Sequence, residues 1–589
     1  MSIPCLNLAI VHPQLFCVEQ ELLLTRLKYI EAGYHQDLRC MEGTRQSLID
    51  HITAWVNNAS DTPQGSVYWI YGSPGIGKTS LAHSICASLH DREQLAGAFF
   101  CRRDDQNLSK PRNILPTLIS KLAGIFPSFR SIVAQRLRND PNLTPDSMKD
   151  ALFLDFIRDL PRQPKHALVF VLDALDECGD AQSRPVLLKV LTDAAVHAPW
   201  LKIIITSRPE VDIQEFFDAF TQPWYLSCDL AADQGASADL RTFAQSQFNL
   251  VAKNWCLSIP WPEKPLFDGV ISRANGLFIF IKTLVLTLEN CEDPTESLKA
   301  TLQNSNSTGS KALHGLYSSI LNTRIVHSTA NFRQMIGVLL TTASYRPLGE
   351  EAIAELAGVR LNLVKKWVNA LSSLLYRDEA ANCGVRVRHL SISEFFFSNH
   401  CVYQINPQDA NVQLGIACLG TMISQLRFYI CGLEDSRLAN ADIEDLSSRI
   451  KKNISDPLQY SCVYWSNHLC FTPNNGDLRA WENLKEFFGG LYKLLWIEVL
   501  SIMGMVPIGA PSLRRVISWA KVSIASACCF HLPTSCRMPI RLFLRKFKML
   551  SFHYRLPYPH FCQHSSHLHF NTTLPTFTIT FINHLPHMV

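Results

Sequence analysis

The first 230 residues alternate between short apolar runs and longer stretches with helical spacing. Apolar runs occupy residues 67–71, 167–173 and 201–206, and each ends in polar residues. Such continuous runs are typical of parallel strands that are buried on both faces. Between them, apolar residues recur every three or four positions from 80 to 90 and from 113 to 138. The pattern therefore predicts a parallel sheet with helices on both faces, with 113–138 as a crossover helix.

The rest of the chain is mainly helical by the same criterion. Residues 236–302 show helical spacing and end in a polar linker at 303–310, and residues 405–500 are helical again. Between these parts, residues 311–400 combine helices with a short strand at 384–389. Upstream of the sheet, residues 19–31 form one short amphipathic pattern. We expect an α/β unit followed by mainly α-helical modules.

The turn after the first apolar run carries the clearest chemistry. It matches the P-loop pattern G-x-x-x-x-G-K-[ST], in which glycine backbone amides enclose phosphates, the lysine reaches the terminal phosphates and the hydroxyl binds Mg²⁺. A chance glycine and serine turn is the alternative, but the strand before it and the helix after it both agree with the motif. The sequence assigns phosphate binding to Gly72, Ser73, Gly75, Gly77, Lys78, Thr79 and Ser80.

A cluster of acidic residues ends the second apolar run. By its position, Asp173 is a candidate Mg²⁺ ligand, together with Thr79 of the P-loop. Asp176 and Glu177 follow the end of the strand. One of these two carboxylates could orient or deprotonate the attacking water. A solvated turn after a core strand is the alternative reading.

The third apolar run ends in Ser207 and Arg208. Ligands of open α/β sheets bind at the carboxyl edge, so Arg208 could detect the γ-phosphate. A surface arginine before Pro209 is the alternative.

These segments resemble the NACHT family of signal-transduction P-loop NTPases, most closely the fungal NOD-like receptor type. The resemblance extends from about residue 38 to about 520 and is strongest between 65 and 210. Besides the P-loop it rests on the lead-in at 40–45, a second strand at 97–104, the double acid in 172–178, the sensor strand at 205–210, and the helical motifs at 261–262, 273–279, 313–321, 460–465 and 494–500.

The resemblance implies a modular signalling protein that binds ATP or ADP with Mg²⁺. It implies a winged helix, with His389 near the β-phosphate in a closed state, and assembly into a homo-oligomer that engages a protein effector. A half-buried histidine in a small sheet is the alternative for His389. The expected modules are a helical remnant (1–37), the NACHT NTPase domain (38–230), a helical domain (231–305), the winged-helix domain (311–403), a second helical domain (404–520) and an atypical tail (521–589).

Composition narrows the possible partners. The chain has 589 residues, 47% of them hydrophobic, with a formal charge of +4, and it contains no basic stripe interleaved with aromatic residues. We therefore expect no nucleic-acid partner. The most apolar helical stretch, residues 491–508, contains Lys493 and Glu498 and is interpreted as a buried helix rather than a membrane span. The 19 cysteines show no C-x-x-C pairs and no secretory leader precedes them, so we expect reduced thiols in the cytoplasm.

The tail differs from the rest of the chain. No Asp or Glu follows Glu498, and no tandem repeat is visible in the sequence. A zinc site could be drawn from Cys562, His564, His567 and His569, but their spacing matches no closed four-ligand site. We interpret the tail as the translation of a shifted frame or unspliced intron that lacks a packed core.

Three functions are compatible with the sequence. The hypothesis that fits best is a nucleotide-dependent switch with slow hydrolysis as its reset. The alternatives are a steady-turnover ATPase that couples energy to work, and a scaffold that binds nucleotide for stability.

Overall fold

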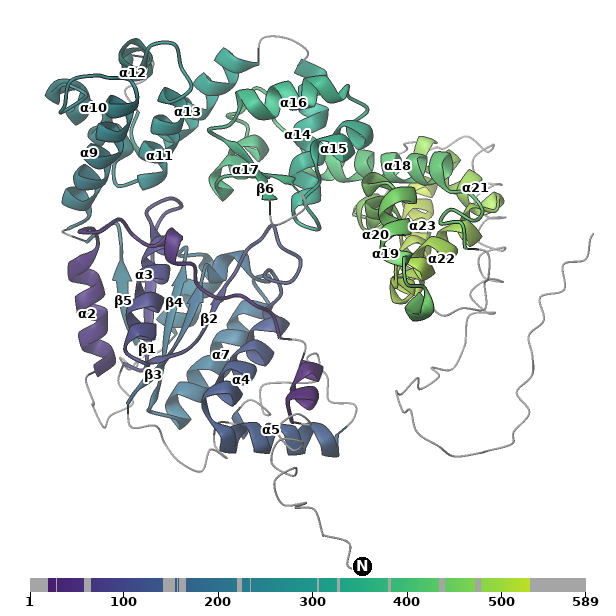
Figure 1. The fold of residues 1–589 in the computed structure, drawn as a ribbon, viewed down its shortest axis with the longest axis horizontal. Helices are drawn as coiled ribbons and strands as arrows, with labels where there is room; N and C mark the ends of the chain where they lie inside the picture. The colour runs from purple at the N-terminus through teal and green to yellow at the C-terminus, as the bar shows by residue number, and fades with distance from the viewer. Residues whose placement is uncertain are drawn as a thin grey trace, which may run out of the picture. The chain divides into compact units, whose positions relative to one another are not determined.

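The structure is a computed structural model (Figure 1). It describes residues 20–27, 29–57, 65–140, 154, 155, 157, 166–219, 225–233, 235–303, 307–325, 329–379, 383–433, 440–471 and 478–529.

A five-stranded parallel sheet forms the centre of the N-terminal part, in the order β2-β3-β4-β1-β5. The central strands β3 and β4 are buried at every position. This confirms the predicted parallel sheet, since only strands covered on both faces tolerate such continuous apolar runs. The strands are β1 (Val67–Tyr71), β2 (Leu95–Phe100), β3 (Leu168–Asp173), β4 (Leu201–Ser207) and β5 (Tyr225–Asp229).

Alternate residues of the central strands β1, β3 and β4 enter two separate cores. On β1, Val67 and Trp69 lie in one core, whereas Tyr68 and Ile70 lie in the other. The first core is completed by helices α4, α5, α7 and α8, and the second by α2 and α3. The helices are α2 (Gln46–Asn57), α3 (Lys78–Asp91), α4 (Ile114–Ile125), α5 (Pro127–Asn139), α7 (Ser183–His197) and α8 (Val211–Asp218).

The expected single crossover helix is in fact two helices. Helix α4 ends before Phe126, whose backbone is extended, and α5 begins with a proline at its first position. Proline disfavours a helical backbone in the residue before it and has no N–H group to donate to the preceding turn of a helix. The prediction of one helix over 113–138 was therefore wrong at Phe126-Pro127.

Two strands were not predicted. The sheet is extended by β5, a short strand of mixed polarity at its edge. The strand predicted at 384–389 is present as β7 (Gly384–Val387), and it pairs antiparallel with β6 (Leu375–Asp378). Both missed strands are too short and too polar for a clear period.

Helices make up the remaining described part of the chain, as expected. Five precede the hairpin region: α9 (Ala236–Asn254), α10 (Lys264–Ala274), α11 (Phe278–Leu288), α12 (Pro294–Gln303) and α13 (Gly309–Arg324). The hairpin lies among α14 (Thr329–Ala343), α15 (Glu350–Ala357), α16 (Leu361–Ala370) and α17 (Leu390–Phe397). Then come α18 (Pro407–Gln425), α19 (Leu446–Asn453), α20 (Asp456–Leu469), α21 (Leu478–Gly489), α22 (Tyr492–Ile502) and α23 (Gly509–Cys529).

The ends of the chain differ in part from expectation. Residues 20–24 are helical and continue into η1 (Thr25–Leu27), which is shorter than the predicted 19–31. Helix α23 continues to Cys529 and therefore crosses the expected boundary at residue 521. The histidines and cysteine considered for zinc lie outside the described residues. No helix within the described ranges is long and apolar enough to cross a membrane.

Helices α18 and α20 pack with their backbones in close approach. A Cβ atom added at Gly415 of α18 would lie 2.4 Å from the backbone nitrogen of Leu469 and 2.6 Å from its Cα. These atoms belong to the end of α20 and cannot rotate away. Gly420, on the same helix, has no neighbouring atom within 4 Å of the corresponding position.

We predict that Gly415→Ala destabilises the protein whereas Gly420→Ala does not. Overpacking usually costs about 1–3 kcal/mol, while alanine in a helix gains roughly 0.5–1 kcal/mol over glycine. Urea unfolding of both variants, followed by tryptophan fluorescence, measures the difference. Equal midpoints for the two variants would contradict the close packing of α18 and α20.

Candidate phosphate site at the sheet edge

The P-loop joins β1 to α3 and has the backbone that its glycines permit. Gly75 and Gly77 have φ of +79° and +100°, which side chains disfavour, and Gly77 caps the N-terminus of α3. Helix α3 begins at Lys78, so its first amides and its positive dipole end face the loop. This arrangement is a general anion-binding site.

Lys78 lies within the loop itself. Its Nζ atom donates to the carbonyl oxygens of Gly72 at 2.6 Å and Ser73 at 3.0 Å. Burial lowers the pKa of the Lys78 ammonium, although the nearby Asp176 opposes this shift. The lysine is thus placed to exchange these carbonyls for phosphate oxygens.

Asp173 and Thr79 come together beneath the loop. The Asp173 carboxylate, 1% exposed, accepts hydrogen bonds from the hydroxyls of Thr206 and Thr79. Burial nevertheless raises the pKa of Asp173 to about 6. The Asp173 carboxylate and the Thr79 hydroxyl form an oxygen pair of the type that Mg²⁺ prefers.

Asp176 is held by Arg208. Its Oδ1 atom accepts the backbone amide of Arg208 at 3.0 Å, and its Oδ2 atom lies 3.2 Å from the Arg208 Nε atom. The same guanidinium forms an ion pair with Glu394 of α17. Arg208 therefore links the sheet edge to a helix that follows the hairpin.

Glu177 has a different environment. It lies in η4 (Leu175–Glu177), and its Oε2 atom accepts the backbone amide of Arg103 at 3.2 Å. Burial raises the pKa of Glu177 to about 7, and the neighbouring Asp176 and Asp173 add to this effect. Of the two water-orienting candidates, Asp176 is the one that forms an ion pair with an arginine.

His389 lies beside the P-loop. A Cβ atom at Gly75 would be 3.8 Å from His389 Cε1 and 2.1 Å from Cγ2 of Ile279, whose amide donates to the Gly75 carbonyl at 3.2 Å. Burial lowers the pKa of His389 to about 4, and the charges of Arg208, Lys78 and Lys282 lower it further. Although part of its surface is accessible, the imidazole is therefore neutral at physiological pH.

Several contacts at this site were missed by sequence reasoning. Arg45, which is buried, donates to the Ile76 carbonyl of the P-loop at 3.2 Å and pairs with Asp233 at 2.7 Å. Lys282 on α11 and Glu394 on α17 were missed as well. The carbonyl oxygen of the predicted Ser80 accepts a local hydrogen bond from the Ser84 hydroxyl. No local motif marks these residues, because their partners are distant in sequence.

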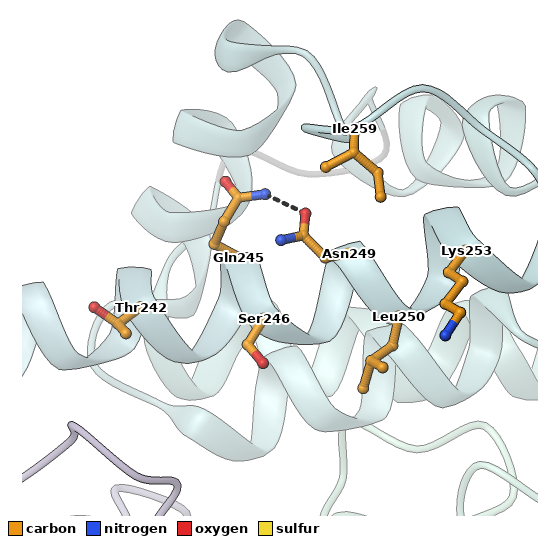
Figure 2. Close-up of a pocket in the computed structure, with 7 residues that line it drawn as sticks. All are labelled: Thr242, Gln245, Ser246, Asn249, Leu250, Lys253 and Ile259. Carbon is orange, nitrogen blue, oxygen red and sulfur yellow. Dashed lines mark hydrogen bonds between the residues drawn. The ribbon is translucent and has the colours of Figure 1, made fainter.

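A separate groove of about 680 Å³ lies on the surface of α9 and contains none of the phosphate-site residues (Figure 2). Gln245 and Asn249 are hydrogen-bonded to each other at 2.9 Å on its floor, with Ile259 opposite. Its lining consists of amide, hydroxyl and aliphatic side chains with one lysine, Lys253, and provides no cluster of charges suited to phosphates. We therefore place the candidate site at the P-loop.

The parallel sheet, the P-loop and the acidic end of β3 together define a P-loop NTPase fold. Residues 43–208 match the family described as nephrocystin 3, N-terminal. Vegetative incompatibility protein HET-E-1 of Podospora anserina is 24% identical over 531 residues, which cover 82% of this chain and 37% of that protein. The match thus spans little more than a third of this relative. The chain is thus similar to this family over residues 43–208 and to this relative over most of its own length.

Solved structures resemble the chain only remotely. The Aeropyrum pernix ORC1 protein in complex with DNA has a TM-score of 0.28 and 10% identity, covering 62% of this chain and 94% of that chain. Replication initiator DnaA, bound to AMPPCP and single-stranded DNA, has a TM-score of 0.27 and 11% identity, covering 58% and 91%. Likenesses this low carry no argument about function.

We predict that Lys78→Ala weakens Mg-ATP binding by roughly 100-fold or more, because hydrogen bonds to charged groups contribute about 1.5–3 kcal/mol each. Isothermal titration of the full chain measures this loss. Lys365→Ala, an exposed lysine on α16, is the matched control and should bind normally. Unchanged affinity in Lys78→Ala would contradict the phosphate site.

Proposed function

We propose that the chain is a nucleotide-dependent signalling switch. It binds Mg-ATP and ADP at the P-loop, hydrolyses ATP slowly, and couples the nucleotide state to opening and self-assembly. ADP favours a closed arrangement, and ATP favours an open one. A ligand shifts such a balance only by its differential affinity for the two states.

One observation carries this proposal: α17 reaches the phosphate loop. His389, which precedes α17, lies against Gly75, and Glu394 on α17 pairs with Arg208 at the end of β4. A group that replaces or displaces these contacts changes how firmly α17 is held. A terminal phosphate is such a group, because it competes with Glu394 for the Arg208 guanidinium.

The modules are assigned as follows. Helices α14, α15 and α16, the β6–β7 hairpin and α17 support a winged helix over 311–403, which also includes most of α13. It lies between helical domains at 231–305 and 404–520. The NTPase domain spans 38–230. In this assignment the winged helix supplies the closing contacts and the P-loop supplies the nucleotide.

Mg²⁺ fits the pair formed by Thr79 and Asp173. Both side chains offer oxygen, and Asp173 is buried with a raised pKa that a cation would oppose. When bound, the ion would neutralise charge on the phosphate oxygens. Mg²⁺ usually takes few protein ligands in such sites, and no larger group of candidate metal ligands occurs among the described residues.

Glu177 is our candidate for the water-orienting carboxylate. Its pKa near 7 gives it the basicity that a general base needs at neutral pH. Asp176 holds Arg208 instead, so that the two neighbouring acids have separate tasks. In the open form we propose homo-oligomerisation and contact with a protein effector in the cytoplasm.

We predict that Glu177→Gln slows ATP hydrolysis at least tenfold while Mg-ATP still binds, whereas Asp173→Asn weakens Mg²⁺-dependent binding. Because Glu177 must be deprotonated to act, the wild-type rate should rise with pH through about 7. Phosphate release measured from pH 5.5 to 9 checks both points. If Glu177→Gln hydrolyses ATP with the wild-type rate and pH profile, Asp176 becomes the candidate for the water-orienting carboxylate.

We predict that His389→Ala favours the open form and lowers ADP affinity by ~1–3 kcal/mol, the value of one hydrogen bond to a charged group. Limited proteolysis and light scattering with ADP or ATP measure closure and self-association. His400→Ala, an exposed histidine after α17, is the control. If the protein gives the same digestion pattern and the same molecular mass with ADP and with ATP, and hydrolyses many ATP molecules per second, the result favours the steady-turnover ATPase.

A further inference from the structure

The loop after β2, residues 101–110, contacts the acidic end of β3 at three points. We name it the β2 loop. The amide of Cys101 donates to the Asp173 carbonyl at 3.0 Å, and the guanidinium of Arg103 donates to the Asp176 carbonyl at 3.1 Å. The amide of Arg103 donates to the Glu177 carboxylate at 3.2 Å. The β2 loop therefore determines where this carboxylate lies.

The residue after Arg103 is bound by the β6–β7 hairpin. Nη1 of Arg386 on β7 lies 2.7 Å from the Asp104 carboxylate and 3.2 Å from the Asp104 carbonyl. The Nε atom of the same guanidinium lies 2.8 Å from Asp378 on β6. We name the Asp104–Arg386 pair the clasp.

The clasp is largely withdrawn from water. The Arg386 side chain is 6% exposed, and Asp104 is held from the other side by Arg102, which belongs to the same loop. A buried ion pair contributes little net stability, but the loss of one partner leaves the other charge buried and unpaired. A second contact reaches the loop from α20, where the Tyr464 hydroxyl donates to Gln106 at 3.2 Å.

We propose that the clasp positions Glu177 for hydrolysis through the β2 loop, so that ATP is hydrolysed faster while the hairpin is still docked than after ATP has opened the closed form. Asp104 and Arg386 are positioning residues, since neither reaches the carboxylate. They fix the adjacent Arg103, whose amide holds Glu177. Undocking of the hairpin frees the loop and with it the carboxylate. This inference rests on the proposed function of Glu177.

The decisive variant is Arg386→Gln, which removes the charge of the clasp. We expect kcat for ATP hydrolysis to fall roughly tenfold while the dissociation constant of Mg-ATP changes less than about threefold. Asp104→Asn breaks the clasp from the NTPase side and should reproduce this split, even if Arg386→Gln fails to fold. The double variant should lose little more than either single one, because both remove the same interaction.

Arg377→Gln is the matched control. Arg377 lies on β6 of the same hairpin, but it binds Glu350 and Asn369, which belong to α15 and α16. Its removal perturbs the hairpin region without touching the β2 loop, so kcat should stay at the wild-type value. An equal loss in Arg377→Gln would show general destabilisation and overturn the clasp.

The Glu177→Gln variant distinguishes a failure of the clasp coupling from a failure of the proposed role of Glu177. If Glu177→Gln abolishes hydrolysis but both clasp variants keep the wild-type kcat, the coupling is wrong and the proposed role of Glu177 survives. If Glu177→Gln hydrolyses ATP at the wild-type rate, the proposed role of Glu177 is wrong, and the coupling that rests on it is wrong as well. Additive losses in the double variant would also overturn the coupling.

Discussion

The absence of a side chain at Gly75 is the constraint on which the rest of the site depends. Its carbonyl accepts the Ile279 amide, and the Ile279 side chain occupies the space that a Cβ would need, with His389 in ordinary contact beside it. A side chain at this position would have to displace Ile279 of α11 from the loop. The P-loop is therefore a phosphate cradle and also the surface on which two later parts of the chain meet.

Three acidic residues within five positions have three different environments. Asp173 is buried against two hydroxyls, Asp176 is paired with Arg208, and Glu177 is held by one backbone amide. In the function that we propose, their partners, rather than their residue type, separate metal binding, charge pairing and water activation. Environments that differ in this way are how neighbouring carboxylates acquire distinct roles.

The local features of the fold were predictable because their causes are local. Apolar runs in β1, β3 and β4 and the four-residue spacing of α3 are properties of short windows, and the structure confirms them. The break between α4 and α5 could have been seen in Pro127, but the apolar spacing on both sides concealed it. Strands β5 and β6 carry few apolar residues, so tertiary pairing rather than pattern specifies them.

The sequence by itself determined the P-loop, the acidic end of β3 and the α/β class, since each depends on residues adjacent in the chain. Only the tertiary structure decided which groups surround them. Arg386 reaches Asp104 across 282 positions and Glu394 reaches Arg208 across 186. No pattern encodes such pairs, because an ion pair depends on where two backbones are brought by packing and not on their spacing in the chain.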